Sequence, residues 1–181
     1  MAKNVLVISA SMRANSNSDM LAAAFADGAA AAGNRVETVS LKGKSIAFCR
    51  GCLACQKLGR CVIADDAVEI TEKMKNADVI AFATPIYYYE MSGQMKTLLD
   101  RMNPLYSSDY RFRRVYMLSV AAEDETYTPE KAVSGLEGWV DCFEKAKLCG
   151  SLFVGGLNGP GEASANAEAL EKAYQFGKNL E

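Results

Sequence analysis

Short apolar runs alternate with segments of helical periodicity along the chain, and this alternation constrains the fold more than any other feature. Five runs are expected to be strands, at residues 5–9, 35–40, 79–83, 115–120 and 151–154. The first, third and fourth are almost continuously apolar, as is typical of strands buried on both faces of a parallel sheet. The pattern predicts an α/β fold: a doubly wound, five-stranded parallel sheet in the order 2-1-3-4-5, with helices on both faces.

Segments with helical spacing separate these runs. In the first segment, Leu21, Phe25 and Ala29 share one face, and Gly33 follows as a C-terminal glycine. Half of the 181 residues are apolar and no repeat or linker interrupts the chain, so we expect a single domain over residues 1–181. Three connections stand out by length or glycine content, at 41–65, 84–93 and 155–161, and such loops in compact domains tend to be functional.

The chain contains no histidine. This absence excludes Ser-His-Asp and Cys-His catalysis as well as an HExxH zinc site. A chain without imidazole can still catalyse demanding chemistry when a bound cofactor carries the reaction. Composition therefore favours a cofactor-dependent enzyme or an electron carrier.

Charge and hydropathy indicate neither a nucleic-acid nor a membrane partner. The net charge is −2, and no apolar run approaches the length of a membrane-spanning helix. Residues 1–4 lead directly into the first run without the layout of a secretory signal. We therefore expect a cytoplasmic protein, in which the six cysteines remain thiols rather than pair as disulfides.

Polar side chains crowd the connection after the first run, where a doubly wound sheet places its ligand. The residues expected to hold a phosphate there are Ser9, Ser11, Arg13, Ser16, Asn17 and Ser18. Hydroxyls, an amide and a guanidinium ahead of a helix N-terminus favour an anion. The loop has neither GxGxxG nor the P-loop ending GKS/T, so a single phosphate monoester suits it better than a dinucleotide or ATP. The competing interpretation is that Ser16 or Ser18 only caps the helix.

Aromatic side chains crowd the connection after the third run. Pro85 stiffens the backbone just past the strand, and the tyrosines offer flat, amphipathic surfaces. The residues expected to line a flat ring such as a flavin are Pro85, Ile86, Tyr87 and Tyr88. The remaining aromatic surface, with Met91 and Met95, is expected to be partly covered by a second subunit. A helix is expected from about Gln94, and its charges are interpreted as a solvated or interface set: Lys96, Asp100 and Arg101.

Four stretches of the first hundred residues together form a specific combination. They are Ser9-x-Ser11-x-Arg13-x-x-Ser16-Asn17-Ser18, the cysteine stretch 49–66, Ala77-Asp78-Val79-Ile80 with Thr84-Pro85-Ile86-Tyr87, and Gln94-Met95-Lys96 with Asp100-Arg101. This combination resembles the flavodoxin-like NAD(P)H-dependent FMN reductases, near their iron–sulfur flavoprotein branch. The resemblance implies a flavodoxin-like fold, FMN bound by the first and third loops, NAD(P)H as donor, and a homodimer or tetramer with the flavin near an interface. One departure is Ala10-Ser11-Met12-Arg13, where many relatives have Gly-Ser-Pro-Arg, and it bears on the geometry of the phosphate contacts.

Four cysteines lie within thirteen residues, with the spacing C-x2-C-x2-C-x5-C: Cys49, Cys52, Cys55 and Cys61. Structural zinc usually takes two pairs separated by a longer span, so this compact run suits zinc poorly. The run looks like a [4Fe–4S] ligand set, whose ferredoxin form also begins C-x2-C-x2-C, and iron–sulfur flavoproteins carry such a motif at this place. Free thiols are the alternative, slightly favoured because relatives with a similar loop need not carry iron.

Two further expectations concern the position of cysteines. The four-cysteine segment follows the second run at the same sheet edge as the other two loops, so we expect it to lie close to the flavin. Cys142 and Cys149 are far away in sequence and are interpreted as buried packing residues.

These observations predict an FMN-dependent oxidoreductase. Electrons would pass from NAD(P)H, or from a ferredoxin-type donor, through the flavin to a quinone, a nitro or azo compound, a free flavin or a protein. No side chain need donate a proton, since the isoalloxazine carries the chemistry. Two alternatives remain: an iron–sulfur or flavodoxin-like electron-transfer carrier without a small-molecule substrate, and a redox sensor whose switch is the cysteine segment.

Overall fold

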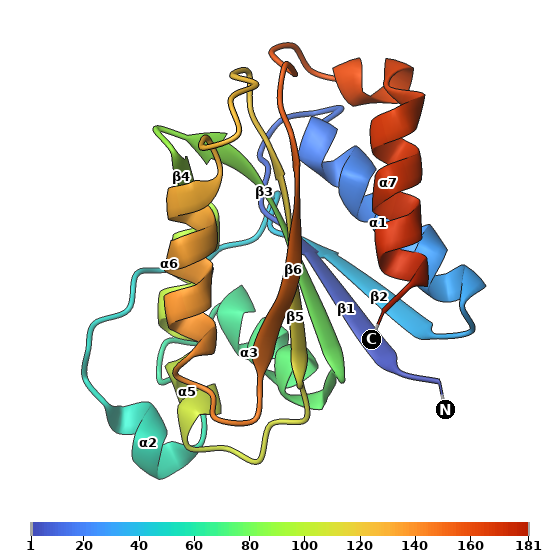
Figure 1. The fold of residues 1–181 in the computed structure, drawn as a ribbon. Coiled ribbons are helices and arrows are strands. Elements are labelled where there is room, and N and C mark those ends of the chain that lie inside the picture. Colours follow the sequence, from blue (N-terminus) through green and yellow to red (C-terminus); the bar gives the residue numbers. More distant parts are fainter. Residues whose placement is uncertain (1, 181) are drawn as a thin grey trace.

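Five parallel strands form the centre of the computed structural model, which describes residues 2–180 (Figure 1). Their order is β2-β1-β3-β5-β6, which is the predicted order 2-1-3-4-5 once the short β4 is set aside. The strands are β1 (Asn4–Ser9), β2 (Arg35–Ser40), β3 (Val79–Tyr87), β5 (Arg114–Val120) and β6 (Lys147–Val154). The predicted fold class is thereby confirmed, and every expected strand is present.

A two-residue strand, β4 (Glu90–Met91), was not expected from the sequence. It turns back on β3 as an antiparallel hairpin, in which Ile86 pairs with Met91 and Tyr87 with Glu90. The aromatic loop is therefore partly regular structure at the carboxyl edge of the sheet.

Helices cover both faces of the sheet (Figure 1). On one face lie α1 (Asn17–Ala31) and α7 (Ala167–Lys178), preceded by the short helix η1 (Glu162–Ala165). The other face carries α3 (Asp66–Asn76), α4 (Gly93–Arg101), α5 (Asn103–Tyr106) and α6 (Glu130–Val140). The small helix α2 (Ala54–Leu58) belongs to the long 41–65 connection, which leaves the carboxyl edge and reaches the opposite end of the molecule.

Side chains of the central strand alternate between two apolar cores. Ile80 and Phe82 face α3, α4 and α6, whereas Val79 and Ala81 face α1. Burial on both faces explains why this run lacks the polar alternation of a one-sided strand. Met91 and Met95 are also buried within the first of these cores, so the expectation that a second subunit covers them was wrong.

Two glycines let α1 and α7 approach each other at the level of their backbones. A Cβ at Gly28 would lie 1.9 Å from the carbonyl oxygen of Tyr174, and one at Gly177 would lie 1.9 Å from that of Phe25. Only residues without a Cβ fit such a crossing. The close contact brings the loop before α1 beside the loop before α7, and this pairing builds one side of the site described below.

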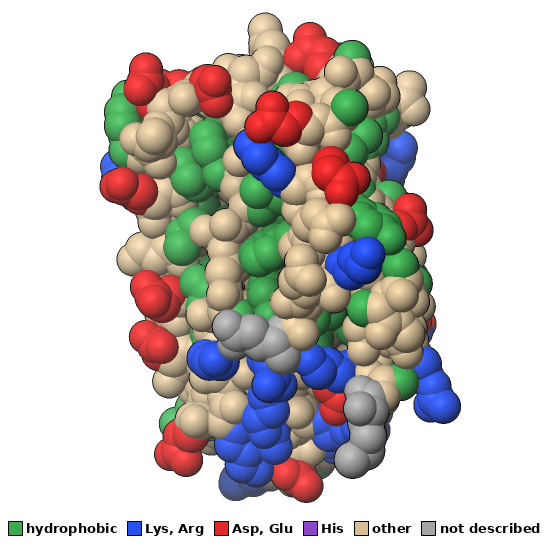
Figure 2. All heavy atoms as spheres, turned by 45° about the vertical axis from the view of Figure 1, so that its right-hand side comes forward, with side chains coloured by type: hydrophobic (Ala, Val, Ile, Leu, Met, Phe, Trp, Pro, Cys, Tyr) green, Lys and Arg blue, Asp and Glu red, His purple; other side chains and the backbone are tan. Residues whose placement is uncertain are grey.

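The surface over α1 and α7 carries mixed charge. Figure 2 shows acidic and basic side chains interspersed with hydrophobic ones on this side of the molecule, with Lys and Arg gathered toward the chain ends. Within residues 2–180, none of the helices combines the length and apolar character needed to cross a bilayer.

Candidate cofactor site and cysteine segment

A cleft of about 240 Å³ lies at the carboxyl edge of the sheet, between the loops that follow β1, β3, β5 and β6. The first loop contributes Ser11, Arg13, Ser16 and Asn17, while the loop after β3 contributes Pro85, Ile86 and Tyr87. One side of the cleft is thus polar and carries a guanidinium, and the other is apolar and aromatic. This division suits a ligand with a phosphate at one end and a flat ring at the other.

Seven of the ten predicted cofactor residues line this cleft, and three do not. Ser9 donates its hydroxyl hydrogen bond to the Asp19 carboxylate. Ser18 is fully buried and its hydroxyl lies 3.0 Å from that of Ser16. Tyr88 is 99% exposed at the tip of the hairpin. Ser16 also caps α1 by accepting from the backbone N–H of Asp19, so the capping interpretation of this serine holds alongside its place in the cleft.

Two more loops complete the cleft: the loop after β5, which the sequence did not single out, and the 155–161 connection, which it singled out as functional without naming site residues. Their lining residues are Val120, Ala121 and Ala122 after β5, and Leu157, Asn158 and Pro160 after β6. The available signal was positional, because the carboxyl ends of parallel strands share one edge. These residues are mostly small or apolar, so they carry no motif of their own.

Hydrogen bonds join the first loop to the last one. The Arg13 guanidinium donates to the carbonyl oxygen of Asn158 at 3.2 Å, and the Asn17 amide donates to that of Gly159 at 2.8 Å. The amide oxygen of Asn17 accepts from the backbone N–H of Ala163 at 3.0 Å. The glycine-rich connection 155–161 therefore closes one side of the cleft.

Backbone strain marks the hairpin beside the cleft. Tyr88 and Tyr89 have φ angles of 52° and 67°, in the left-handed region that bulky residues avoid. Two consecutive positive φ angles are what a two-residue hairpin turn demands, and Asn-Gly is the usual choice. The β3–β4 pairing and the buried Met91 hold this turn in place, and thereby fix Tyr87 at the cleft.

The second tyrosine of this turn is anchored to the loop after β5. The Tyr89 hydroxyl lies 3.3 Å from the Glu123 carboxylate, which also accepts from the Thr128 hydroxyl at 2.8 Å. The negative charge of Glu123 raises the pKa of Tyr89 and that of Tyr127, whose ring centre lies 6.2 Å from the Tyr89 ring. These contacts connect the aromatic hairpin to the loop that supplies Ala121 and Ala122.

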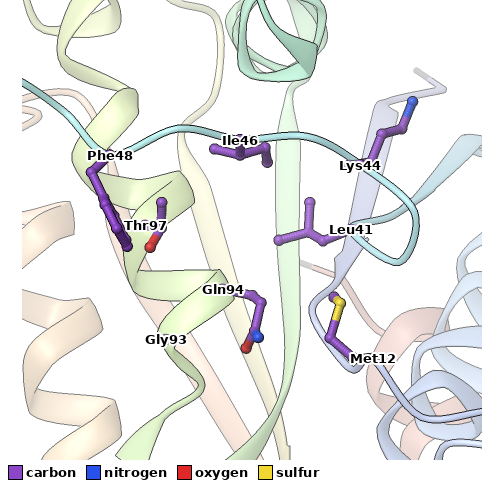
Figure 3. Close-up of a pocket in the computed structure, with 8 residues that line it drawn as sticks. All are labelled: Met12, Leu41, Lys44, Ile46, Phe48, Gly93, Gln94 and Thr97. Carbon is purple, nitrogen blue, oxygen red and sulfur yellow. The ribbon is translucent and has the colours of Figure 1, made fainter.

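A second hollow of about 360 Å³ adjoins the cleft on the far side of the first loop. Figure 3 shows the segment carrying Leu41, Lys44, Ile46 and Phe48 passing above Met12 and the start of α4. Met12 lines this hollow while its neighbours Ser11 and Arg13 line the cleft, so the two spaces share one wall. The mainly apolar lining suits a flat, uncharged ligand.

A buried ion pair anchors both ends of the cysteine segment. The Arg101 side chain is fully buried and donates to both carboxylate oxygens of Asp65, at 2.6 and 2.9 Å. Arg101 also donates to the carbonyl oxygens of Ala47 and Ile63, which flank the cysteines on either side. The interpretation of Arg101 as a solvated or interface charge was wrong. For Lys96 and Asp100 it was correct, because their ion pair is exposed.

The four cysteines line one small cavity, together with Arg101 and Asn103. Cys55 is buried, Cys61 is half-buried, and Cys49 and Cys52 are exposed; all four are free. Sulfur atoms accept hydrogen bonds from Arg101, Asn103 and the backbone N–H of Gly51. This all-thiol donor set with N–H partners fits the chemistry of an iron–sulfur cluster. Within residues 2–180, however, no three potential ligand side chains are drawn together closely enough to hold a metal ion.

The cysteines do not lie beside the cofactor cleft, contrary to expectation. Arg101 is the last residue of α4 and Asn103 the first of α5, whereas Gly93, at the N-terminal end of α4, lies at the carboxyl edge of the sheet. The nine residues of α4 span eight steps of about 1.5 Å, so its two ends lie about 12 Å apart. The long connection carries the cysteines away from the edge at which it starts, which its place after β2 did not reveal (Figure 1).

The other two cysteines also differ from expectation. Cys142, just beyond α6, is exposed, with its thiol 3.5 Å from the carbonyl oxygen of Gly138. Cys149 lies within β6, which begins four residues earlier than predicted, and it is half-buried against the core on the α1 side. Cys142 is therefore not a packing residue, whereas Cys149 is one in part.

Comparison with known proteins gives a consistent picture. The family model for NADPH-dependent FMN reductases matches residues 3–128. An iron–sulfur flavoprotein of Methanocaldococcus jannaschii is 40% identical over 101 residues, covering 56% of this chain and 52% of the relative. Another, from Methanosarcina thermophila, is 32% identical over 152 residues, covering 83% and 79%. The match thus spans about half of the first relative and about four fifths of the second.

A solved structure confirms the fold over the whole chain. It is the NAD(P)H:quinone oxidoreductase from Methanothermobacter marburgensis, with a TM-score of 0.77 and 21% identity. The comparison covers 100% of this chain and 97% of that one. The chain belongs to the NADPH-dependent FMN reductase family, near its iron–sulfur flavoprotein branch.

Proposed function

We propose that the protein is an FMN-dependent oxidoreductase that takes electrons from NAD(P)H or from a ferredoxin-type donor. The observation that carries this proposal is the cleft itself, polar and cationic along the first loop and apolar along the third. A phosphate monoester joined to a flat ring matches that division, and the family match supports the same cofactor. Bound FMN would supply the reversible uptake and release of electrons.

Each wall of the cleft has a distinct task in this proposal. The hydroxyls of Ser11 and Ser16, the Asn17 amide and the Arg13 guanidinium hold the phosphate through charge-assisted and neutral hydrogen bonds. Pro85, Ile86 and Tyr87 support the ring, with Ala121 and Ala122 leaving room beside it. No residue of this chain needs to exchange a proton with the substrate.

The proposal extends to the site at which the electron acceptor binds. We place a flat aromatic acceptor, such as a quinone or a nitro or azo compound, in the hollow of Figure 3, because it is apolar and shares a wall with the cleft. A free flavin or a redox protein would dock over the same opening. Replacing Phe48 by Ala should raise the KM for a quinone several-fold, whereas Tyr106→Ala, at an exposed tyrosine outside both spaces, serves as the control.

The assembly is proposed to be a homodimer or tetramer. Tyr88 is 99% and Phe48 79% exposed, which is more than aromatic side chains usually show on an isolated chain. Light scattering at micromolar concentration should give at least twice the mass of 19.5 kDa. A monomeric mass would contradict the assembly while leaving the cofactor proposal intact.

A second redox group is favoured by the four cysteines. Two relatives of the chain are named iron–sulfur flavoproteins. In this structure four free thiols line one cavity, and three N–H groups donate to their sulfur atoms. We propose that these thiols bind a [4Fe–4S] cluster, which would make the protein an electron-transfer partner as well as a reductase. Anaerobic protein should then contain close to four iron and four sulfide ions per chain.

One preparation tests the flavin part directly. Protein purified anaerobically should be yellow and release FMN, not FAD, on denaturation, and it should oxidise NAD(P)H in the presence of a quinone. Arg13→Ala should weaken FMN binding by about 1–3 kcal/mol, a factor of about 5–150 in Kd. Arg35→Ala, which removes an exposed arginine away from the cleft, should leave Kd unchanged. Released FAD, or equal FMN affinity in both variants, would refute the placement.

A further inference from the structure

Two side chains from the junction of α4 and α5 reach two of the four cysteine sulfurs. The Arg101 guanidinium donates to Sγ of Cys61 at 3.3 Å, and the Asn103 amide donates to Sγ of Cys55 at 3.1 Å. The donors are two residues apart, whereas their acceptors lie 40 and 48 positions away along the chain. One short stretch of backbone therefore determines where two sulfur atoms sit.

The arginine is rigidly oriented. Both of its terminal nitrogens bind Asp65, whose carboxylate also accepts from the backbone N–H groups of Ala47 and Ala67. A planar guanidinium held at two points has no freedom to turn, and the Nη2 group that binds Asp65 also donates to Sγ of Cys61 and to the carbonyl oxygen of Ile63, each at 3.3 Å. The Arg101 side chain is fully buried, so its positive charge faces this sulfur without intervening water.

The other two sulfurs are held less firmly. Cys49 and Cys52 are exposed and lie ahead of α2, and Cys49 accepts only a 3.5 Å contact from the backbone N–H of Gly51. The cysteine set therefore has a fixed half, Cys55 and Cys61, and an exposed half, Cys49 and Cys52. Because only two of the four sulfur atoms are held by side chains, the four thiols line one cavity without all lying close together.

We propose that Arg101 and Asn103 are positioning residues for the iron–sulfur cluster, holding Cys61 and Cys55 as the preformed half of its ligand set. The inference rests on the cluster part of the proposed function. Outer hydrogen bonds orient metal ligands and commonly change metal affinity 10- to 100-fold when lost. Hydrogen bonds to sulfur and nearby charge also set the reduction potential of such a cluster. Asn103 and Arg101 thus tune the cluster as well as orient its ligands.

Asn103 offers the sharper test, because Arg101 also holds the segment together. Asn103→Leu removes the N–H donor at similar size and no charge, and Asn103→Asp replaces the donor by a carboxylate that repels sulfur anions. Asn76→Asp is the matched control: it makes the same chemical change at an exposed asparagine that bonds only the carbonyl oxygen of Glu72. Each variant is purified anaerobically with its FMN and reconstituted with iron and sulfide.

Two readouts follow the cluster itself rather than turnover. Competition with an iron chelator should show affinity about 10-fold lower for Asn103→Leu and up to about 100-fold lower for Asn103→Asp. The midpoint potential of the cluster, followed by electron paramagnetic resonance, should become more negative from wild type to Leu to Asp. FMN content should be unchanged, because Asn103 does not line the cleft.

Two results would overturn the inference. The first is that both Asn103 variants match Asn76→Asp in iron affinity and midpoint potential. The second is that wild-type protein takes up no iron and sulfide although it binds FMN, which would leave the flavin proposal standing. If wild-type protein instead carries the cluster but no FMN, the flavin proposal is contradicted. The comparison of the Asn103 variants with Asn76→Asp would still test the inference about the cluster.

Discussion

Replacing Asp65 by Asn should weaken the fold far more than an ordinary loss of one surface charge. The Asp65 carboxylate accepts two hydrogen bonds from Arg101 and one each from the backbone N–H groups of Ala47 and Ala67. An amide offers one acceptor oxygen in place of two, and it leaves the buried guanidinium without a counter-charge. Removing one partner of a buried pair costs about 3–5 kcal/mol, because the other charge remains buried and uncompensated.

The control for this change lies on the same helix as Arg101. Asp100 pairs with Lys96 at 2.6 Å, but both side chains are more than half exposed. Asp100→Asn removes an i,i+4 pair of this kind, worth about 0.5 kcal/mol. The double variant Asp65→Asn/Arg101→Gln removes the stranded charge, so it should be more stable than the sum of its single changes predicts, by about 0.5–3 kcal/mol.

The effect should also depend on pH in a defined direction. Burial raises the pKa of Asp65, but its hydrogen bonds and the Arg101 charge outweigh burial, so the pKa lies below the usual 3.8. A lowered carboxyl pKa stabilises the fold fully above 3.8, and this contribution disappears as pH falls through the lower folded-state value. The difference between wild type and Asp65→Asn should therefore be constant from neutral pH to about 4 and shrink below that.

Urea unfolding followed by circular dichroism at several pH values measures these differences. The slope with urea should stay the same, so that a shift in midpoint reports stability alone. A loss below about 1 kcal/mol, equal to that of Asp100→Asn, would refute the assignment of the pair as the anchor of the cysteine segment. A difference that grows as the solution is acidified would refute the sign of the pKa argument.

Three further predictions concern other parts of the molecule. Gly177→Ala should cost about 1–3 kcal/mol because its Cβ would strike backbone, whereas Gly138→Ala, with open space, should gain about 0.5–1 kcal/mol; urea midpoints check both. Tyr88→Asn should raise the free energy of unfolding by about 1 kcal/mol, since asparagine tolerates the positive φ, and an unchanged urea midpoint would contradict strain there. Glu123→Gln should lower the pKa of Tyr89 toward 10.0, read from phenolate absorbance with Tyr89→Phe as the reference.

Much of the fold could be predicted because its signals are local. The buried strands appear as apolar runs, and residues such as Leu21, Phe25 and Ala29 repeat at helical spacing and are indeed buried. The polar first loop and the Pro85–Tyr87 stretch were recognisable for the same reason, since strand ends in a parallel sheet meet at one edge. The structure brings both stretches to one cleft, although their roles toward FMN remain proposals.

The sequence was misleading where a residue's surroundings depend on distant partners. Arg101 looks like a surface charge because its compensating partner, Asp65, lies 36 positions away. Cys142 occupies an apolar helical spacing but sits just past the end of α6, where the face no longer points inward. The path of the cysteine segment away from the cleft likewise depends on that distant ion pair, which no local pattern encodes.

The close crossing of α1 and α7 has a consequence for how the protein matures on the ribosome. Domains fold as units during synthesis, generally from the N-terminus onward. A nascent chain that has emerged through β5 already has its first and third loops, but it lacks the 155–161 stretch and the helix that Gly28 and Gly177 dock in place. Arg13 and Asn17 lack these carbonyl partners until Asn158 and Gly159 have been added and the connection has folded back onto the first loop. On the proposed function, the cleft would therefore bind FMN fully only after residues 155–178 have folded against the first loop.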